Sequence, residues 1–127
     1  MKIRNGFVSN SSSSSFVLAI TETCSEEDLK EIFLKYKERF DEMEDTLDYE
    51  IGKRETYLTE DAYYDKIASM LAKEFYSYFN NKYSNPVEIS NWLIVAEYMG
   101  WEDGLMGEFL YGILPNLNED KIIIRGY

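Results

Sequence analysis

The residue types that carry out most enzyme chemistry are scarce in this chain. It contains no histidine, which excludes a Ser-His-Asp triad, a Cys-His dyad, histidine metal ligands and imidazole acid–base catalysis. Its one cysteine, Cys24, stands just before a predicted helix N-terminus, where a thiolate would be stabilised. Without a histidine base we interpret Cys24 as a small apolar residue. We therefore expect a non-enzymatic protein with no cofactor and no bound metal.

Carboxylates are the abundant reactive groups, and their densest run lies at 41–50. The segment reads DEMEDTLDYE and contains no base. Its acids are Asp41, Glu42, Glu44, Asp45, Asp48 and Glu50. Because the run lacks the D-x-D-x-D-G spacing of a calcium-binding loop, it is interpreted as a solvated charged face or as a contact surface. As a contact surface it binds a basic protein or mimics nucleic-acid phosphates.

A smaller acidic group surrounds Trp101. Glu102, Asp103 and Glu108 lie in a glycine-containing segment, and paired carboxylates can carry out general acid–base work. No pair among them has a distinguishing context. We therefore interpret the segment as a polar loop anchored by a buried tryptophan.

The tyrosines around the second predicted long helix are too many for one apolar stripe. We expect Tyr64, Tyr76 and Tyr83 to be exposed and to belong to a partner surface. An ordinary amphipathic rim is the alternative. The partner surface predicted from the sequence therefore combines the acidic run 41–50 with Tyr64 and Tyr76.

A run of serines separates two apolar pieces near the N-terminus. It consists of Ser11, Ser12, Ser13, Ser14 and Ser15. Such runs are usually irregular connections. Their hydroxyls and backbone N–H groups also suit an anion-binding nest or a modification tag, although the glycines and lysine of a phosphate-binding loop are missing. Because Val8 and Phe16 flank the run, we predict a tight crossover between two strands.

Residues 4–16, which read RNGFVSNSSSSSF, resemble the opening of a group of small uncharacterised proteins from bacteriophages and their relatives in bacterial genomes. The resemblance ends there, and it brings no activity, cofactor or catalytic residue. It implies a phage or prophage origin. It also suggests that the signature is a tag read by a phage factor during processing, modification or packaging.

The charge of the chain narrows its choice of partner. Its 24 acids and 13 bases give a net charge of −11, which repels polyanions and favours basic proteins over direct nucleic-acid binding. No apolar run approaches the length of a transmembrane helix, and no apolar secretory segment precedes the serines. We expect a protein of the host cytoplasm that has no membrane association, with the virion as the alternative location.

Apolar spacing predicts strands and helices in the first two thirds of the chain. Segment 3–8 is a short strand candidate, and 16–20 is an inner strand buried on both faces. Ser25 caps a helix that ends near 41–44, and Thr59 opens a second helix that runs to about residue 80.

The last third is predicted to hold a third helix and a hairpin. Asn85, Pro86 and Glu88 have the pattern of a capped helix start, and Gly100 is a natural stop. Segments 108–114 and 121–125 have the composition of two strands, joined by a turn-rich loop over 115–120.

These elements predict one α+β domain over 1–127, with a signature segment at 1–15 and an acidic connecting segment at 41–58. Its sheet is small and mainly antiparallel, with the N-terminal strand beside a C-terminal hairpin and three helices on one face. The predicted function is that of a phage or prophage accessory protein acting through protein–protein interaction. The alternatives are an acidic nucleic-acid mimic that inhibits a host nucleic-acid-binding protein, and a virion structural component.

Overall fold

The computed structural model describes residues 13–80, 84–100 and 102–127. The α+β fold is confirmed, with a five-stranded antiparallel sheet in the order β2-β3-β1-β5-β4. The strands are β1 (Ser13–Thr21), β2 (Val87–Ile89), β3 (Trp92–Gly100), β4 (Asn116–Asn118) and β5 (Ile122–Gly126). The α-helices are α1 (Glu26–Leu34), α2 (Glu44–Ile51), α3 (Glu60–Asn80) and α4 (Gly104–Glu108). Short 3-10 helices cover Lys37–Met43 and Arg54–Thr56, and a π-helical turn covers Phe109–Ile113.

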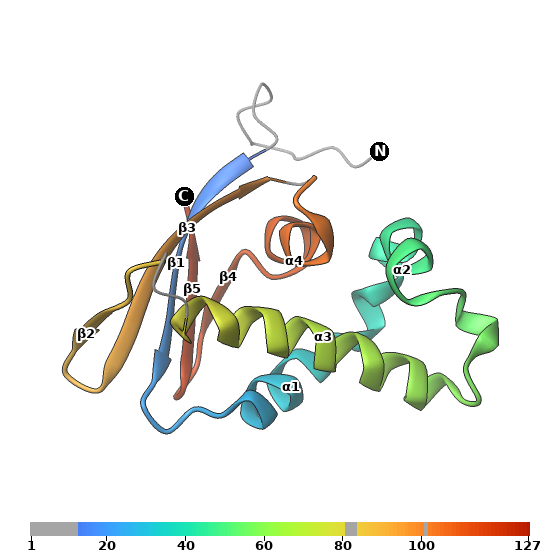
Figure 1. Cartoon of the computed structure of the whole chain (residues 1–127), viewed down its shortest axis with the longest axis horizontal. Helices are drawn as coiled ribbons and strands as arrows, with labels where there is room; N and C mark the ends of the chain where they lie inside the picture. The colour runs from blue at the N-terminus through green and yellow to red at the C-terminus, as the bar shows by residue number, and fades with distance from the viewer. Residues whose placement is uncertain (1–12, 81–83, 101) are drawn as a thin grey trace.

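The helices occupy one side of the sheet. In Figure 1, α1, α3 and α4 lie on the same side of the strands, and α2 lies at the end of the molecule remote from the sheet. The core forms between the sheet and these helices. Phe33 lies at its centre, with edge-to-face contacts to Phe75 (5.5 Å) and Phe109 (5.1 Å). Among the described residues, no helix is long and apolar enough to cross a membrane.

Strand β1 is central and pairs with β3 and β5, as an inner strand should. Phe16, Leu18 and Ile20 belong to the core, whereas Val17 and Ala19 point to the opposite side of the sheet. The prediction of burial on both faces is therefore only half right. The strand is apolar on both faces, but helices cover only one of them.

The serine run is not a crossover where it is described. Ser13, Ser14 and Ser15 are the first residues of β1, and they pair with 98–100 of β3. Serine is tolerated there because the partner strand supplies the backbone hydrogen bonds. Ser11, Ser12 and the strand candidate at 3–8 lie outside the described residues.

The predicted third helix is wrong, because β2 and β3 form a hairpin in its place. Asn85 has φ +51°, not the extended backbone of a helix cap, and Ser90 has φ +54° in the two-residue turn between the strands. Isoleucine, valine and aromatic residues are frequent in 92–100, which suits a strand. Pairing along the whole length of β1 decides the outcome.

The strand predicted at 108–114 is also wrong. Helix α4 and the π-helical turn occupy this region, and Phe109, Leu110, Tyr111 and Ile113 are all buried. Their burial fits a helical segment packed under the core better than the alternation of a half-covered strand. The C-terminal hairpin therefore consists of β4, in the segment predicted as a turn, and β5.

The first two helix starts are confirmed. The Ser25 hydroxyl accepts a hydrogen bond from the Asp28 N–H (3.1 Å), and the Asp28 carboxylate accepts one from the Ser25 N–H (3.0 Å), which completes a capping box. Thr59 accepts from the Ala62 N–H (3.0 Å) at the start of α3. Helix α1 ends earlier than predicted, at Leu34, and the chain continues as a 3-10 helix.

Candidate interaction surfaces

The acidic run 41–50 forms regular helical structure, and its acids lie in three different environments. Asp41, Glu42 and Asp48 form ion pairs with Arg54 (2.5 Å), Arg39 (2.7 Å) and Lys53 (3.6 Å), respectively. Asp45 and Glu50 line a groove, and Glu44 is exposed at the start of α2. The six acids therefore do not form one continuous face.

The groove lies between α2 and the region of α4 and has a volume of about 460 Å³. Carboxylates from both sides line it, and no lysine or arginine is among the lining residues. The lining residues are Asp45, Thr46, Tyr49, Glu50, Glu102, Gly104 and Glu108. The two acidic groups are more than fifty residues apart in the sequence, and the fold brings them together. We call this feature the acidic groove.

Local structure explains how the acidic groove is built. Leu47 is buried on the inner side of α2, which leaves Tyr49 outward with 91% of its surface exposed. The Thr46 hydroxyl donates a hydrogen bond to the Glu108 carboxylate and joins the two walls. Gly107 lets α4 approach the end of β3, because a Cβ there would collide with the Gly100 carbonyl oxygen. This approach brings Glu102 and Glu108 to the groove.

A second groove contains both acids and lysines, and ion pairs cross it. It measures about 520 Å³ and lies between α1 and the loop before β5. Both of its lysines pair across it, Lys35 with Glu119 (3.3 Å) and Lys121 with Asp28 (3.2 Å), and Glu31 and Asp120 also line it. The backbone N–H of Ser25 and the ammonium of Lys121 lower the pKa of Asp28. The acidic groove has no comparable internal cations.

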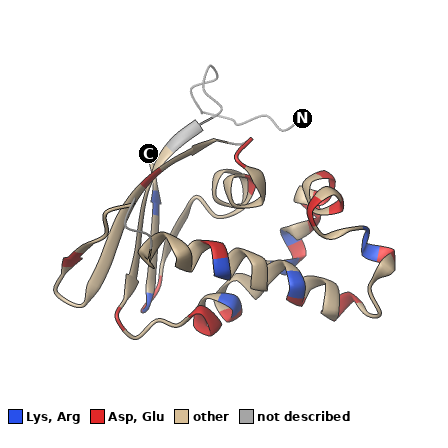
Figure 2. Ribbon diagram, viewed as in Figure 1, with Lys and Arg blue, Asp and Glu red and all other residues tan. Residues whose placement is uncertain are grey.

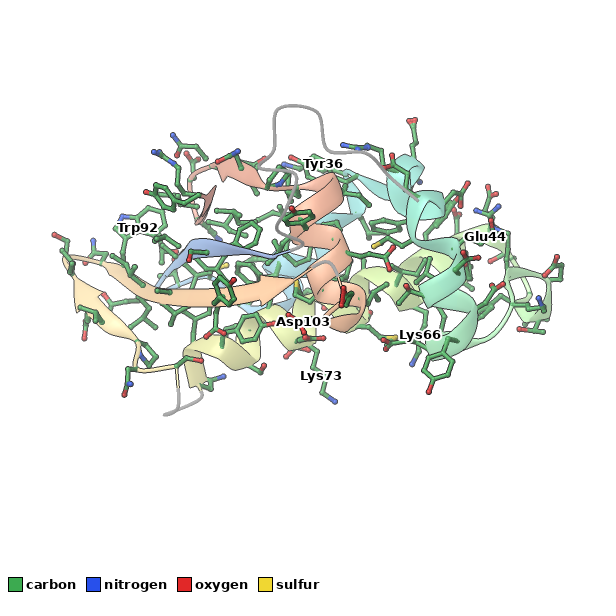
Figure 3. The ribbon with its side chains drawn as sticks, turned by 90° about the horizontal axis from the view of Figure 1, so that it is seen from above. Tyr36, Glu44, Lys66, Lys73, Trp92 and Asp103 are labelled. Atoms are coloured by element: carbon green, nitrogen blue, oxygen red, sulfur yellow. The ribbon has the colours of Figure 1, made fainter. Side chains whose placement is uncertain are left out.

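Further carboxylates lie near the acidic groove. The Tyr78 hydroxyl donates to the Glu74 carboxylate (3.1 Å) on α3. Burial raises the pKa of Tyr78 far above its usual value, and the nearby charges of Glu74, Glu97 and Asp103 add to the shift. Although Glu74 is exposed overall, desolvation of its carboxyl group raises its pKa, and Glu50 raises it further. This part of the molecule therefore carries excess negative charge. Figure 3 shows Asp103 beside the α4 helix.

The predicted exposure of two tyrosines is wrong. Tyr64 and Tyr76 are half-buried and pack against the core. The Tyr64 hydroxyl accepts a hydrogen bond from Arg54 (2.7 Å), and its ring lies 6.0 Å from that of Phe40. Tyr83 lies outside the described residues. Tyr49 is the exposed tyrosine of the acidic region, and its place opposite Leu47 on a helix is the sequence signal that identifies it.

Cys24 has the environment of a structural residue. Only 3% of its surface is exposed. Burial raises the pKa of its thiol to about 11, the charge of Asp28 contributes, and Lys121 opposes the shift. The thiol is therefore protonated at neutral pH, which agrees with its interpretation as a small apolar residue.

The side of the sheet remote from the helices carries an apolar patch that the sequence did not predict. Cross-strand pairing aligns Val87, Ile94, Ala19 and Ile123 in one row across four strands. Val17, Ile89, Trp92, Ala96 and Tyr98 lie on the same side. We call these nine residues the open sheet face. Figure 3 shows Trp92 at the sheet end of the molecule and Glu44 at the opposite end.

Exposure confirms that no described element covers this face. Val87 is 55% exposed, Ile89 57% and Tyr98 71%. Ala19 is buried, but it does not belong to the core, and its paired neighbours on the same side are Ile94 and Ile123. A contiguous exposed apolar patch of this kind marks an interaction site in most proteins.

The chain was compared with protein families, curated proteins and solved structures. No family model, no curated protein and no solved structure matches this chain. Within the described ranges, no group of three or more His, Cys, Asp or Glu side chains is placed to hold a metal ion.

Proposed function

We propose that the protein acts by binding a basic protein partner in the acidic groove. The observation that carries the proposal is the contrast between the two grooves. The groove beside α1 is crossed by its own ion pairs, whereas the acidic groove has Asp45, Glu50, Glu102 and Glu108 among its lining residues and no lysine or arginine. A cationic partner would supply the missing positive charge.

The geometry favours a protein over a small cation. Tyr49 stands at the edge of the groove with nearly all of its surface free. Tyrosine combines a large apolar area with a polar tip and is enriched where proteins meet. A partner could pack an apolar side chain on this ring while its arginine or lysine side chains reach the carboxylates.

The proposal extends to the biological setting. The resemblance of residues 4–16 to phage proteins supports a phage or prophage accessory protein that acts on a basic host or phage protein. If that partner is a nucleic-acid-binding protein, the acidic groove competes with nucleic acid for it. Competition by a DNA duplex for the same partner tests this version of the proposal.

The first test measures binding of a fluorescent twelve-residue peptide of alternating glycine and arginine. The groove variant Asp45→Asn/Glu50→Gln/Glu102→Gln should bind it about tenfold more weakly at low salt, since three exposed ion pairs are each worth up to about 1 kcal/mol. The matched control Glu22→Gln/Glu26→Gln/Glu31→Gln removes the same charge from exposed positions on the α1 side and should retain most of the affinity. Equal losses in the two variants would show that only net charge matters and would refute the groove.

A second variant isolates the aromatic contribution. Tyr49→Ala leaves the charge unchanged and removes a ring that makes little contact with the fold. We expect unchanged thermal stability and an affinity for a tyrosine-containing version of the same peptide that falls severalfold. Unchanged affinity would remove Tyr49 from the site.

A further inference from the structure

We propose that two copies of this chain associate face to face through the open sheet face and form a two-fold symmetric dimer. This inference is independent of the acidic groove, which lies on the other side of the sheet. It assigns a partner to the apolar side of a sheet whose core side is already fully used.

The first support is chemical. A one-layer antiparallel sheet that faces water normally alternates apolar and polar residues. Here the outward row Val87, Ile94, Ala19 and Ile123 is apolar on four strands, and it ends at Asn118 on the edge strand β4. Arg125 on β5 is the charged residue that the strand register adds to this side, and Ser15, Thr21 and Asn116 are polar residues at its margins.

The second support is shape. Ala19, a small residue on the central strand, lies between two larger ones, Ile94 on β3 and Ile123 on β5. A two-fold axis that runs parallel to the strands between Ala19 and Ile94 would place Ile94 of each copy over Ala19 of the other. Alternation of large and small side chains is how the inner faces of packed sheets interdigitate. A self-complementary patch is the requirement for a symmetric dimer.

The third support is area. The strands contain nine, three, nine, three and five residues. With a rise of about 3.4 Å per residue and a strand spacing of about 4.8 Å, they present a plane of roughly 500 Å². Two such faces, if covered completely, would bury about 1,000 Å² in total, which is the minimum expected of a biological interface.

The fourth support is electrostatic. Each copy carries a net charge of −11, so most ways of bringing two copies together are repulsive. Figure 2 shows most of the acidic segments on the helices and few on the strands. In a face-to-face dimer the helical layers are separated by two sheets about 10 Å apart. The acidic layers therefore lie beyond the Debye length of about 8 Å at physiological ionic strength.

The test is sedimentation velocity over a range of protein concentrations at physiological salt. The apparent mass of the wild-type protein should rise from 15.0 kDa to twice that value as its concentration increases through the micromolar range. Ile94→Lys should raise the dissociation constant at least tenfold, because a lysine there must be buried without a partner. Ala96→Lys, at an exposed position of the same face, should act in the same direction without threatening the fold.

The matched control is Leu58→Lys. Leu58 is 99% exposed, before α3, so the same change of an apolar residue to lysine should leave the dimer intact. A wild-type chain that stays monomeric at high concentration would overturn the proposal. So would a dimer that survives both sheet-face variants. Peptide binding in the acidic groove should be the same in folded Ala96→Lys and wild-type protein, so this experiment fails or succeeds separately from the proposed function.

Discussion

The two sides of the sheet differ in the chemistry they present. On the helical side most of the apolar residues are enclosed in the core, and the outer surface is charged, with acids in excess. On the other side the strands present isoleucine, valine, alanine and tryptophan directly outward. Stability of the single chain requires only the first arrangement. The second adds nothing to the core, and it is the side that we propose for contact between two copies of the chain.

The grooves differ in a similar way. The groove beside α1 contains both charges, and each acid of an ion pair there has its cation within 3.3 Å. The acidic groove contains carboxylates and a bridging Thr46 hydroxyl. Both are open surface features of similar volume. The presence of lysines among the lining residues, more than size, therefore distinguishes the two grooves.

The largest effect should come from comparing two neighbours on β1. Leu18 is fully buried in the core, whereas Val17 faces the open side. Leu18→Ala should reduce the free energy of unfolding by about 2–5 kcal/mol. Val17→Thr should change it by no more than about 1 kcal/mol when urea unfolding is measured at a concentration where the chain is monomeric. Comparable losses would mean that the open side is as important to the fold as the core side.

A smaller effect should follow from removing one cation that holds the acidic region in place. Arg54 lies 5.2 Å from the centre of the Tyr63 ring and 5.5 Å from that of Tyr64, and it pairs with Asp41. Arg54→Met should cost about 1–2 kcal/mol of unfolding free energy, from lost cation–π and ion-pair contacts.

The neighbouring Lys53→Met is the control for Arg54→Met. Lys53 is largely exposed, and its pair with Asp48 is long, at 3.6 Å. The loss should stay below about 0.5 kcal/mol. Equal losses would show that net charge, not the contacts of Arg54, determines the stability of this region.

The smallest effect concerns the pH dependence of the acidic side. Because desolvation raises the pKa of Glu74 above its usual 4.5, folding favours its neutral form. The group therefore stabilises the fold below pH 4.5, and this contribution disappears as the pH rises through the raised value. Glu74→Gln should gain thermal stability relative to wild type at pH 7 more than at pH 4. An equal difference at the two pH values would contradict the raised pKa.

Local signals predicted part of the fold well. Ser25 followed by Asp28 forms a capping box that depends on four consecutive residues, and β1 could be recognised from an uninterrupted apolar run. The helix predicted from Asn85 and Pro86 does not form. Pairing of the nine residues of β3 with β1 stabilises a strand more than a helix cap would stabilise a helix. Phe109 and its neighbours were assigned to a strand, because local composition does not reveal that they pack beneath Phe33 and Phe40.

The candidate surfaces were predictable to different degrees. The sequence identified the acids of 41–50 as a candidate surface. It did not predict which of them form ion pairs, because Arg54, for example, lies thirteen positions from its partner Asp41. Glu102 and Glu108 reach the groove beside α2 only through tertiary packing, which local sequence does not reveal. The open sheet face could not be found at all, since it exists only once 92–100 is recognised as a strand.

The most direct test of the difference between the two sides is sedimentation equilibrium of the wild-type chain at 0.05 M and 0.5 M sodium chloride. An apolar sheet-to-sheet contact predicts a dimer at both concentrations, with a dissociation constant that is unchanged or lower at high salt, because repulsion between the acidic layers is screened. A chain that is monomeric at both salt concentrations, or a dimer that dissociates as salt is added, would contradict the assignment of the open sheet face to a second copy.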